Sequence, residues 1–113
     1  MRIHIENFQP MTLNQLMKIH WGSRTKHKQS DYAMIAAYSR HIPKATQKRR
    51  VEMTIQLAPR QRASDVDAFW KTCLDGLVKC GMLVDDSPKW CEIMPVQFTR
   101  DKLKATTILL TDI

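Results

Sequence analysis

Apolar and polar residues alternate most clearly over residues 51–57, VEMTIQL. The apolar members are Val51, Met53, Ile55 and Leu57. Because successive side chains of a strand point to opposite faces, this period of two predicts a strand with one buried face. Residues 3–6 alternate in the same way and residues 106–111 are rich in strand-forming side chains, so each segment predicts a further strand.

Residues 65–79 follow the longer period of a helix. Their apolar residues recur at spacings of three and four, which predicts one buried stripe. The stripe consists of Val66, Trp70, Cys73, Leu74 and Leu77. Asp67, Lys71 and Asp75 repeat every fourth residue and therefore share a different face. Gly81 is expected to end the helix, because glycine readily adopts the left-handed conformation found at helix ends.

Residues 30–41 predict a second helix, with Ser30 as its N-cap and Pro43 as its stop. Its expected apolar stripe consists of Met34, Ile35, Tyr38 and Ile42. Residues 9–27 lie between the first strand and this helix and are interpreted as a long connection that leads into a basic run. A connection of this length is more often functional than idle.

Residues 90–98 are predicted to be extended, but Pro95 restricts them to an edge strand or a bulged one. The predicted order is therefore strand, helix, strand, helix, strand, strand, with no repeat and no dividing linker. We expect one α+β domain over residues 1–113, with a mixed sheet and both helices on one face. The last two strands are close in sequence and are predicted to pair as a hairpin.

Charge and composition restrict the partners. The 113 residues carry a formal net charge of +7, which suits a polyanionic partner. No apolar run approaches the roughly 20 residues that a membrane-spanning helix needs, so no membrane partner is expected. The first residues have no signal-peptide apolar core, so export is not expected. Three cysteines without a close pair favour reduced thiols inside a cell, and we expect a cytoplasmic protein.

The acidic residues around residues 65–79 have two interpretations. In the first, Ser64 and Asp67 form a capping pattern at a helix start, and Asp85 and Asp86 belong to an ordinary turn. In the second, the acids from both ends of the helix meet and bind Mg²⁺, a hard ion that prefers carboxylate oxygens. Bound against a phosphate, such an ion would orient water and neutralise developing charge.

The residues from 65 to 86 combine D-x-D-x-x-x-K with a later G-x-x-x-D-D. This arrangement resembles the RusA-type Holliday junction resolvases, small dimeric endonucleases encoded mainly by bacteriophages and prophages. The likeness in element order covers essentially the whole chain, whereas the residue-by-residue likeness is confined to the central motif. Ala68 stands where the family usually has asparagine, and Ser64 stands where it often has arginine.

The resemblance implies a Mg²⁺-dependent hydrolase that resolves four-way DNA junctions as a homodimer, with Mn²⁺ expected to substitute. It implies that Asp65, Asp67 and Asp86 hold the metal and that Lys71 assists at the phosphate. These four residues would form the catalytic site, and Asp85 would support it. Two alternatives stay open: a nucleic-acid-binding module of the same fold that has lost cleavage, and a structural interaction protein whose aspartates are caps.

Basic residues outside the motif are candidate contacts for DNA phosphates, which would make binding depend steeply on salt. They are Arg24, Lys26, His27, Lys28, Arg60 and Arg62. A solvated basic loop is the alternative for residues 24–28. The cysteines and histidines lack the close paired spacing of a structural zinc site, so zinc is not expected.

Overall fold

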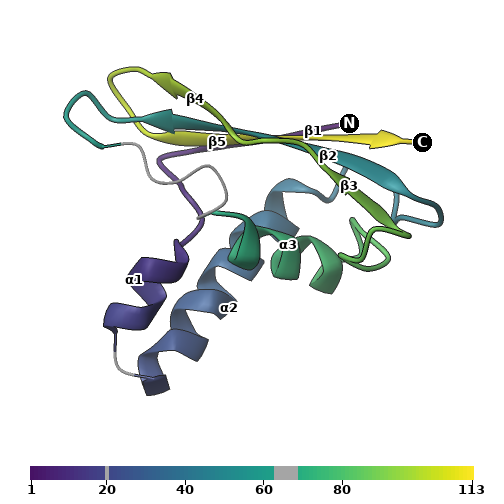
Figure 1. The fold of residues 1–113 in the computed structure, drawn as a ribbon, viewed down its shortest axis with the longest axis horizontal. Coiled ribbons are helices and arrows are strands. Elements are labelled where there is room, and N and C mark those ends of the chain that lie inside the picture. The colour runs from purple at the N-terminus through teal and green to yellow at the C-terminus, as the bar shows by residue number, and fades with distance from the viewer. Residues whose placement is uncertain (20, 63–68) are drawn as a thin grey trace.

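The computed structural model describes residues 1–19, 21–62 and 69–113. The elements follow one another as β1 (Arg2–Glu6), α1 (Leu13–Lys18), α2 (Trp21–Tyr38), β2 (Arg49–Leu57), α3 (Trp70–Lys79), β3 (Cys91–Ile93), β4 (Gln97–Arg100) and β5 (Ala105–Asp112). A mixed sheet forms one layer, and the helices lie together on one of its faces (Figure 1). The predicted α+β class and mixed sheet are therefore confirmed.

Strand β2 is at the centre of the sheet. Along one edge it pairs antiparallel with β5, which in turn pairs antiparallel with β1. Its other edge is shared by two short parallel partners, β3 beside residues 49–51 and β4 beside residues 54–57. Pro95 lies in the gap between these two strands, where it interrupts the ladder as predicted for an edge.

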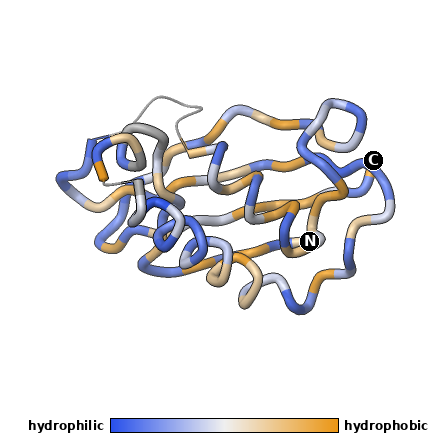
Figure 2. Tube along the Cα trace, turned by 90° about the horizontal axis from the view of Figure 1, so that it is seen from below, coloured by the Kyte–Doolittle hydropathy of each residue, from blue (hydrophilic) through white to orange (hydrophobic). Residues whose placement is uncertain are grey.

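The core lies between the sheet and the helices. The β2 residues at positions 51, 53, 55 and 57 are buried and the residues between them are half-exposed, as the period of two predicts. Helix α3 buries Trp70, Cys73, Leu74 and Leu77, so these four members of its predicted stripe are confirmed. Figure 2, seen from the helical side, shows hydrophobic and hydrophilic colours alternating along the strands and mainly hydrophilic colours in the outer loops.

The predicted hairpin of the last two strands is wrong. β4 and β5 lie on opposite edges of β2, and residues 101–104 pass around the end of that strand. The amide of Asp101 donates to the carbonyl of Leu57 at 3.0 Å, an ordinary hydrogen-bond length. The side-chain amide of Gln56 donates to the carbonyl of Leu103 at 2.7 Å. A short connection therefore joins two strands that never pair, because both bind β2 instead.

The predicted long connection over residues 9–27 is also wrong, because it contains α1 and the first part of α2. Helix α1 begins with a capping box: the Thr12 hydroxyl accepts from the Gln15 amide at 3.2 Å, and the Gln15 side chain accepts from the Thr12 amide at 2.9 Å. Helix α2 begins at Trp21, not near Ser30, and ends at Tyr38, before the predicted end. Most described side chains over residues 22–30 are exposed, so no apolar stripe marks this half of the helix.

Both ends of α3 bear on the prediction for residues 65–79. Phe69 is the N-cap and makes no side-chain cap hydrogen bond, so the described helix begins at Trp70. The sequence does not mark this start, because phenylalanine is not one of the residues that usually cap a helix. The predicted end is confirmed: the helix ends at Lys79, and Gly81 has a φ of 81°. None of the described helices is long and apolar enough to cross a membrane.

Candidate functional site

Two of the predicted metal ligands, Asp65 and Asp67, lie outside the described residues, as do Ser64 and Ala68. The described residues on either side of this gap contact β4. Before the gap, residues 58–61 form a turn closed by the Gln61 amide, which donates to the Ala58 carbonyl at 3.1 Å. After the gap, Phe69 is buried, and its ring centroid lies 6.2 Å from that of Phe98 on β4.

Arg100, at the end of β4, holds the turn before the gap. Its Nη1 donates to the carbonyl oxygens of Ala58 at 2.6 Å, Pro59 at 3.1 Å and Gln61 at 2.7 Å. Gln61 is fixed from the other side by Gln9, through side-chain hydrogen bonds of 2.6 and 3.0 Å. The strand that packs on Phe69 therefore also orders the backbone that leads toward the acidic motif.

Asp86, the third predicted ligand, lies in the loop that follows α3 and is exposed. A hollow of about 180 Å³ separates this loop from the helix and is lined by Asp75, Val78, Lys79, Asp85 and Asp86. The fold thus brings Asp86 to α3, next to a carboxylate from the helix itself. Lys71 is exposed one helical turn before Asp75, so it shares that helix face but does not line the hollow.

Asp75 lies outside the motif, although its position four residues after Lys71 puts it on the same helix face. Its carboxylate interacts with the hydroxyl of Tyr32 on α2. Burial raises the pKa of that tyrosine, and the charge and hydrogen bonding of Asp75 raise it further. The ammonium of Lys79 lies 5.2 Å from the centre of the same ring. These contacts restrict the orientation of the acid that faces Asp86.

The negative charge of Asp86 also affects a thiol on the sheet, that of Cys91. Burial raises the pKa of the Cys91 thiol on β3 to about 11, the negative charge of Asp86 adds to this effect, and Lys48 opposes it. Within residues 1–19, 21–62 and 69–113, no group of three or more acidic, histidine or cysteine side chains is placed to hold a metal. Carboxylate oxygens are the donors that Mg²⁺ prefers, and the complete set would need the two aspartates outside these ranges.

The candidate DNA contacts occupy two places. Arg24, Lys26, His27 and Lys28 lie on the N-terminal half of α2, and Arg60 and Arg62 lie in the connection after β2. Lys26 and His27 are exposed, whereas the guanidinium of Arg24 already makes hydrogen bonds to the backbone. Its guanidinium donates to the carbonyl oxygens of Ile19 at 3.1 Å and Met17 at 3.3 Å, bracing the connection between α1 and α2. The basic residues 24–28 therefore lie on a helix and not in the loop expected from the sequence.

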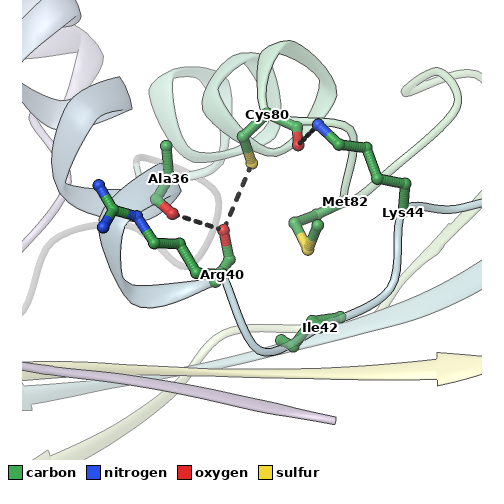
Figure 3. Close-up of a pocket in the computed structure, with 7 residues that line it drawn as sticks. Ala36, Arg40, Ile42, Lys44, Cys80 and Met82 are labelled. Atoms are coloured by element: carbon green, nitrogen blue, oxygen red, sulfur yellow. Dashed lines mark hydrogen bonds between the residues drawn. The ribbon is translucent and has the colours of Figure 1, made fainter.

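A larger hollow, of about 340 Å³, contains none of the predicted site residues. It is lined by Ala36, Ser39, Arg40, Ile42, Lys44, Cys80 and Met82, from the ends of α2 and α3 and the loops after them. Figure 3 shows the ammonium of Lys44 donating to the carbonyl of Cys80, a hydrogen bond of 3.2 Å. The guanidinium of Arg40 points away from the hollow. The Ser39 hydroxyl lies 3.8 Å from the Cys80 sulfur. No sequence pattern had indicated this hollow.

Neither a protein-family model nor a curated protein sequence matches the chain. The functional interpretation therefore depends on the motif over residues 65–86 and on the geometry of its described members.

Proposed function

We propose that the protein is a Mg²⁺-dependent, structure-selective endodeoxyribonuclease that resolves four-way DNA junctions in recombination and repair. One observation carries the proposal: Asp86 lines the same hollow as Asp75, one helical turn beyond Lys71. A carboxylate from α3 and one from the loop after it thus lie together beside one face of the helix. This supports the Mg²⁺ interpretation over that of an ordinary turn, which would not require Asp86 to face the helix.

In the proposed site, Asp65, Asp67 and Asp86 hold Mg²⁺, which would neutralise charge and activate water at a phosphodiester bond. The ammonium of Lys71 faces the scissile phosphate and stabilises the negative charge that develops on its oxygens. The exposed basic side chains of α2, together with Arg60 and Arg62, hold the DNA backbone. The chain acts as a homodimer in the cytoplasm of a bacterial or phage-infected cell, so that each copy cuts one of two opposed strands.

A nucleic-acid-binding module without cleavage is the second candidate. It is favoured by the two departures within the motif, Ala68 and Ser64. The same basic surface would then bind DNA, and the carboxylates would not complete a catalytic site.

A synthetic four-way junction, incubated with and without Mg²⁺, tests the proposal. The unaltered protein should introduce paired nicks only when Mg²⁺ or Mn²⁺ is present, and Asp67→Asn should abolish cleavage while retaining binding. A linear duplex of the same sequence is the control for structure selectivity. Salt-sensitive binding of the junction without nicks in any divalent metal would establish the binding module instead, and the absence of binding would leave a structural interaction protein.

Thermal unfolding provides a separate test that does not depend on activity. Because a ligand that binds only the folded state stabilises it, Mg²⁺ should raise the melting temperature of the unaltered protein and not that of Asp67→Asn. If Asp65 is only a helix cap, Asp65→Ala should cost about 0.5–2 kcal/mol of stability, and Mg²⁺ should have no effect. The second outcome would reject the metal site.

A further inference from the structure

The sheet has one face that no described element covers (Figure 1). All three helices lie on the other face. The uncovered face, called the open face below, is formed by the strand residues that alternate with the buried ones. They are Arg2, His4, Glu6, Arg50, Glu52, Thr54, Gln56, Glu92, Gln97, Thr99, Thr107, Leu109 and Thr111.

The charge of the open face differs from that of the chain as a whole. Its strand residues include two arginines and three glutamates, so their side chains carry a net charge of −1, whereas the whole chain carries +7. One of these arginines is already paired, because Arg50 Nε lies 3.2 Å from a carboxylate oxygen of Glu92. A polyanion would gain little from such a surface. A protein surface of mixed charge fits it better.

One row of the open face runs across three adjacent strands. In the ladder, Leu109 of β5 is paired with Arg2 of β1 on one side and with Glu52 of β2 on the other. Residues opposite one another in neighbouring strands point to the same face, so a leucine lies between a positive and a negative side chain. Leu109 is 39% exposed, and neither charged side chain has an ion-pair partner within the described residues.

We propose that a second copy of this chain packs on the open face, related by a twofold axis that runs parallel to the strands and passes through Leu109. Such an axis reverses the order of the strands across the sheet in the second copy. It leaves each residue at the same height along the strand direction. Leu109 then meets Leu109 of the second copy, Arg2 meets Glu52 of the second copy, and the reciprocal pair forms on the other side. The row is therefore complementary to itself, as a twofold interface requires.

The side chains in the adjacent rows are also compatible with this twofold axis. Thr107 lies between His4 and Thr54, so threonine meets threonine and histidine meets threonine. Gln56 and Glu6 occupy the two sides of the next row, so a carboxylate meets an amide. Packed sheets lie about 10 Å apart and rotate by about 30°, so alignment is best near the axis, where the row containing Leu109 lies. No like charges oppose one another in these three rows.

The proposal names a surface for the dimer proposed above but does not require the nuclease assignment, since a chain that cleaves nothing could still dimerise in this way. In this dimer the helices of both copies face outward. The basic half of α2 and the hollow beside Asp86 consequently stay accessible in each copy. Oligomeric state and junction cleavage are separate measurements, so each proposal can fail without the other.

A charge-swap experiment tests the surface. We expect the protein over residues 1–113 to dimerise in light scattering and sedimentation over a range from about 1 µM to about 1 mM, which spans weak and tight association. Arg2→Glu and Glu52→Arg should each raise the dimer dissociation constant at least about tenfold, since each places two pairs of like charges in contact. Mixing the two variants should restore dimers that contain one copy of each, and the double variant R2E/E52R should restore the homodimer.

A lysine substitution on the open face and one away from it provide the matched control. Leu109→Lys should separate the copies, because it places two ammonium groups opposite each other on the axis. Val84→Lys, at an apolar side chain of similar exposure in the loop after α3 (41% against 39% for Leu109), lies outside the open face and should leave the dimer unchanged. Circular dichroism of each variant confirms that it is folded. A monomer at every concentration, a dimer that survives Leu109→Lys, or singly substituted variants that fail to associate when mixed would overturn the proposal, as would loss of DNA binding by Arg2→Glu without a change in mass.

Discussion

Arg49 and Asp112 form an ion pair in which Arg49 Nε lies 2.8 Å from the carboxylate, with the arginine side chain 3% exposed and the aspartate side chain 46% exposed. The remaining guanidinium nitrogens donate to the carbonyl oxygens of Met82 at 3.0 Å and Pro43 at 2.8 Å. One buried side chain at the start of β2 thus joins the loop after α2, the loop after α3 and the end of β5. The loop that it holds through Met82 is the one that carries Asp86.

Arg49→Met should be clearly destabilising. The variant leaves the buried Met82 carbonyl without its donor, which costs about 1–3 kcal/mol. Asp112→Asn should cost less than about 1 kcal/mol, because the Asp112 carboxylate is half-exposed and screened by water. Urea unfolding of both variants measures the difference. Equal losses would mean that the ion pair, and not the carbonyl contacts, provides the stability.

Asp75→Asn should lower junction cleavage by about 10–100-fold, the usual effect of removing a residue that orients a metal ligand. The substitution keeps the shape of the side chain but removes the charge that faces Asp86 and Tyr32. DNA binding should stay unchanged, and the Mg²⁺ concentration needed for half-maximal rate should rise. Asp101→Asn, in the turn after β4, is the control and should have no effect on either quantity. Unchanged cleavage in Asp75→Asn would restrict that residue to its contact with α2.

Arg100→Lys should reduce cleavage more than stability. A lysine side chain ends one bond short of the Arg100 Nη1 position, so its ammonium does not reach all three carbonyl oxygens of the turn over residues 58–61. Because these contacts are at the surface, we expect a stability loss of only about 1 kcal/mol. If the turn positions the acidic motif, the turnover number should fall while junction affinity is kept. Lys102→Ala is the control, and a parallel fall in stability and cleavage would indicate a purely structural role.

Cys80 should react first among the three thiols. Cys73 and Cys91 are buried, and burial raises both thiol pKa values, that of Cys91 to about 11. At pH 8 only about one Cys91 thiol in a thousand is therefore ionised. Alkylation followed by mass spectrometry should show one fast site, and Cys80→Ser should remove it. Since the raised pKa favours the neutral thiol in the folded state, stability from Cys91 should be lost as the pH rises from about 9 toward 11.

The sequence was sufficient for elements with a strong period. Positions 51, 53, 55 and 57 identified β2, and the stripe from Trp70 to Leu77 identified α3, because each buries one regular face. The first half of α2 was not found, since its exposed polar residues leave no stripe to detect. For α1 the sequence carries only a local signal, because the threonine at position 12 followed by glutamine at position 15 forms a capping box.

Strand pairing and the surroundings of the motif could not be predicted in the same way. Proximity in sequence suggested that β4 pairs with β5, but both pair with β2, and this choice depends on long-range packing. The side chains that organise the candidate site, Arg100, Gln61 and Tyr32, belong to no motif. Only the fold reveals that they bear on the residues around Asp65–Asp86.

The position of β5 has a consequence for synthesis on the ribosome. β1 pairs only with β5 among the described strands, and β5 also fills the edge of β2. During synthesis β1 therefore waits for β5 before it gains a neighbour, and the edge of β2 that β5 fills stays unpaired for the same period. Nascent chains should consequently stay sensitive to protease until residues 105–112 have left the exit tunnel, and late-translation stalling should yield insoluble fragments in place of a partly working protein.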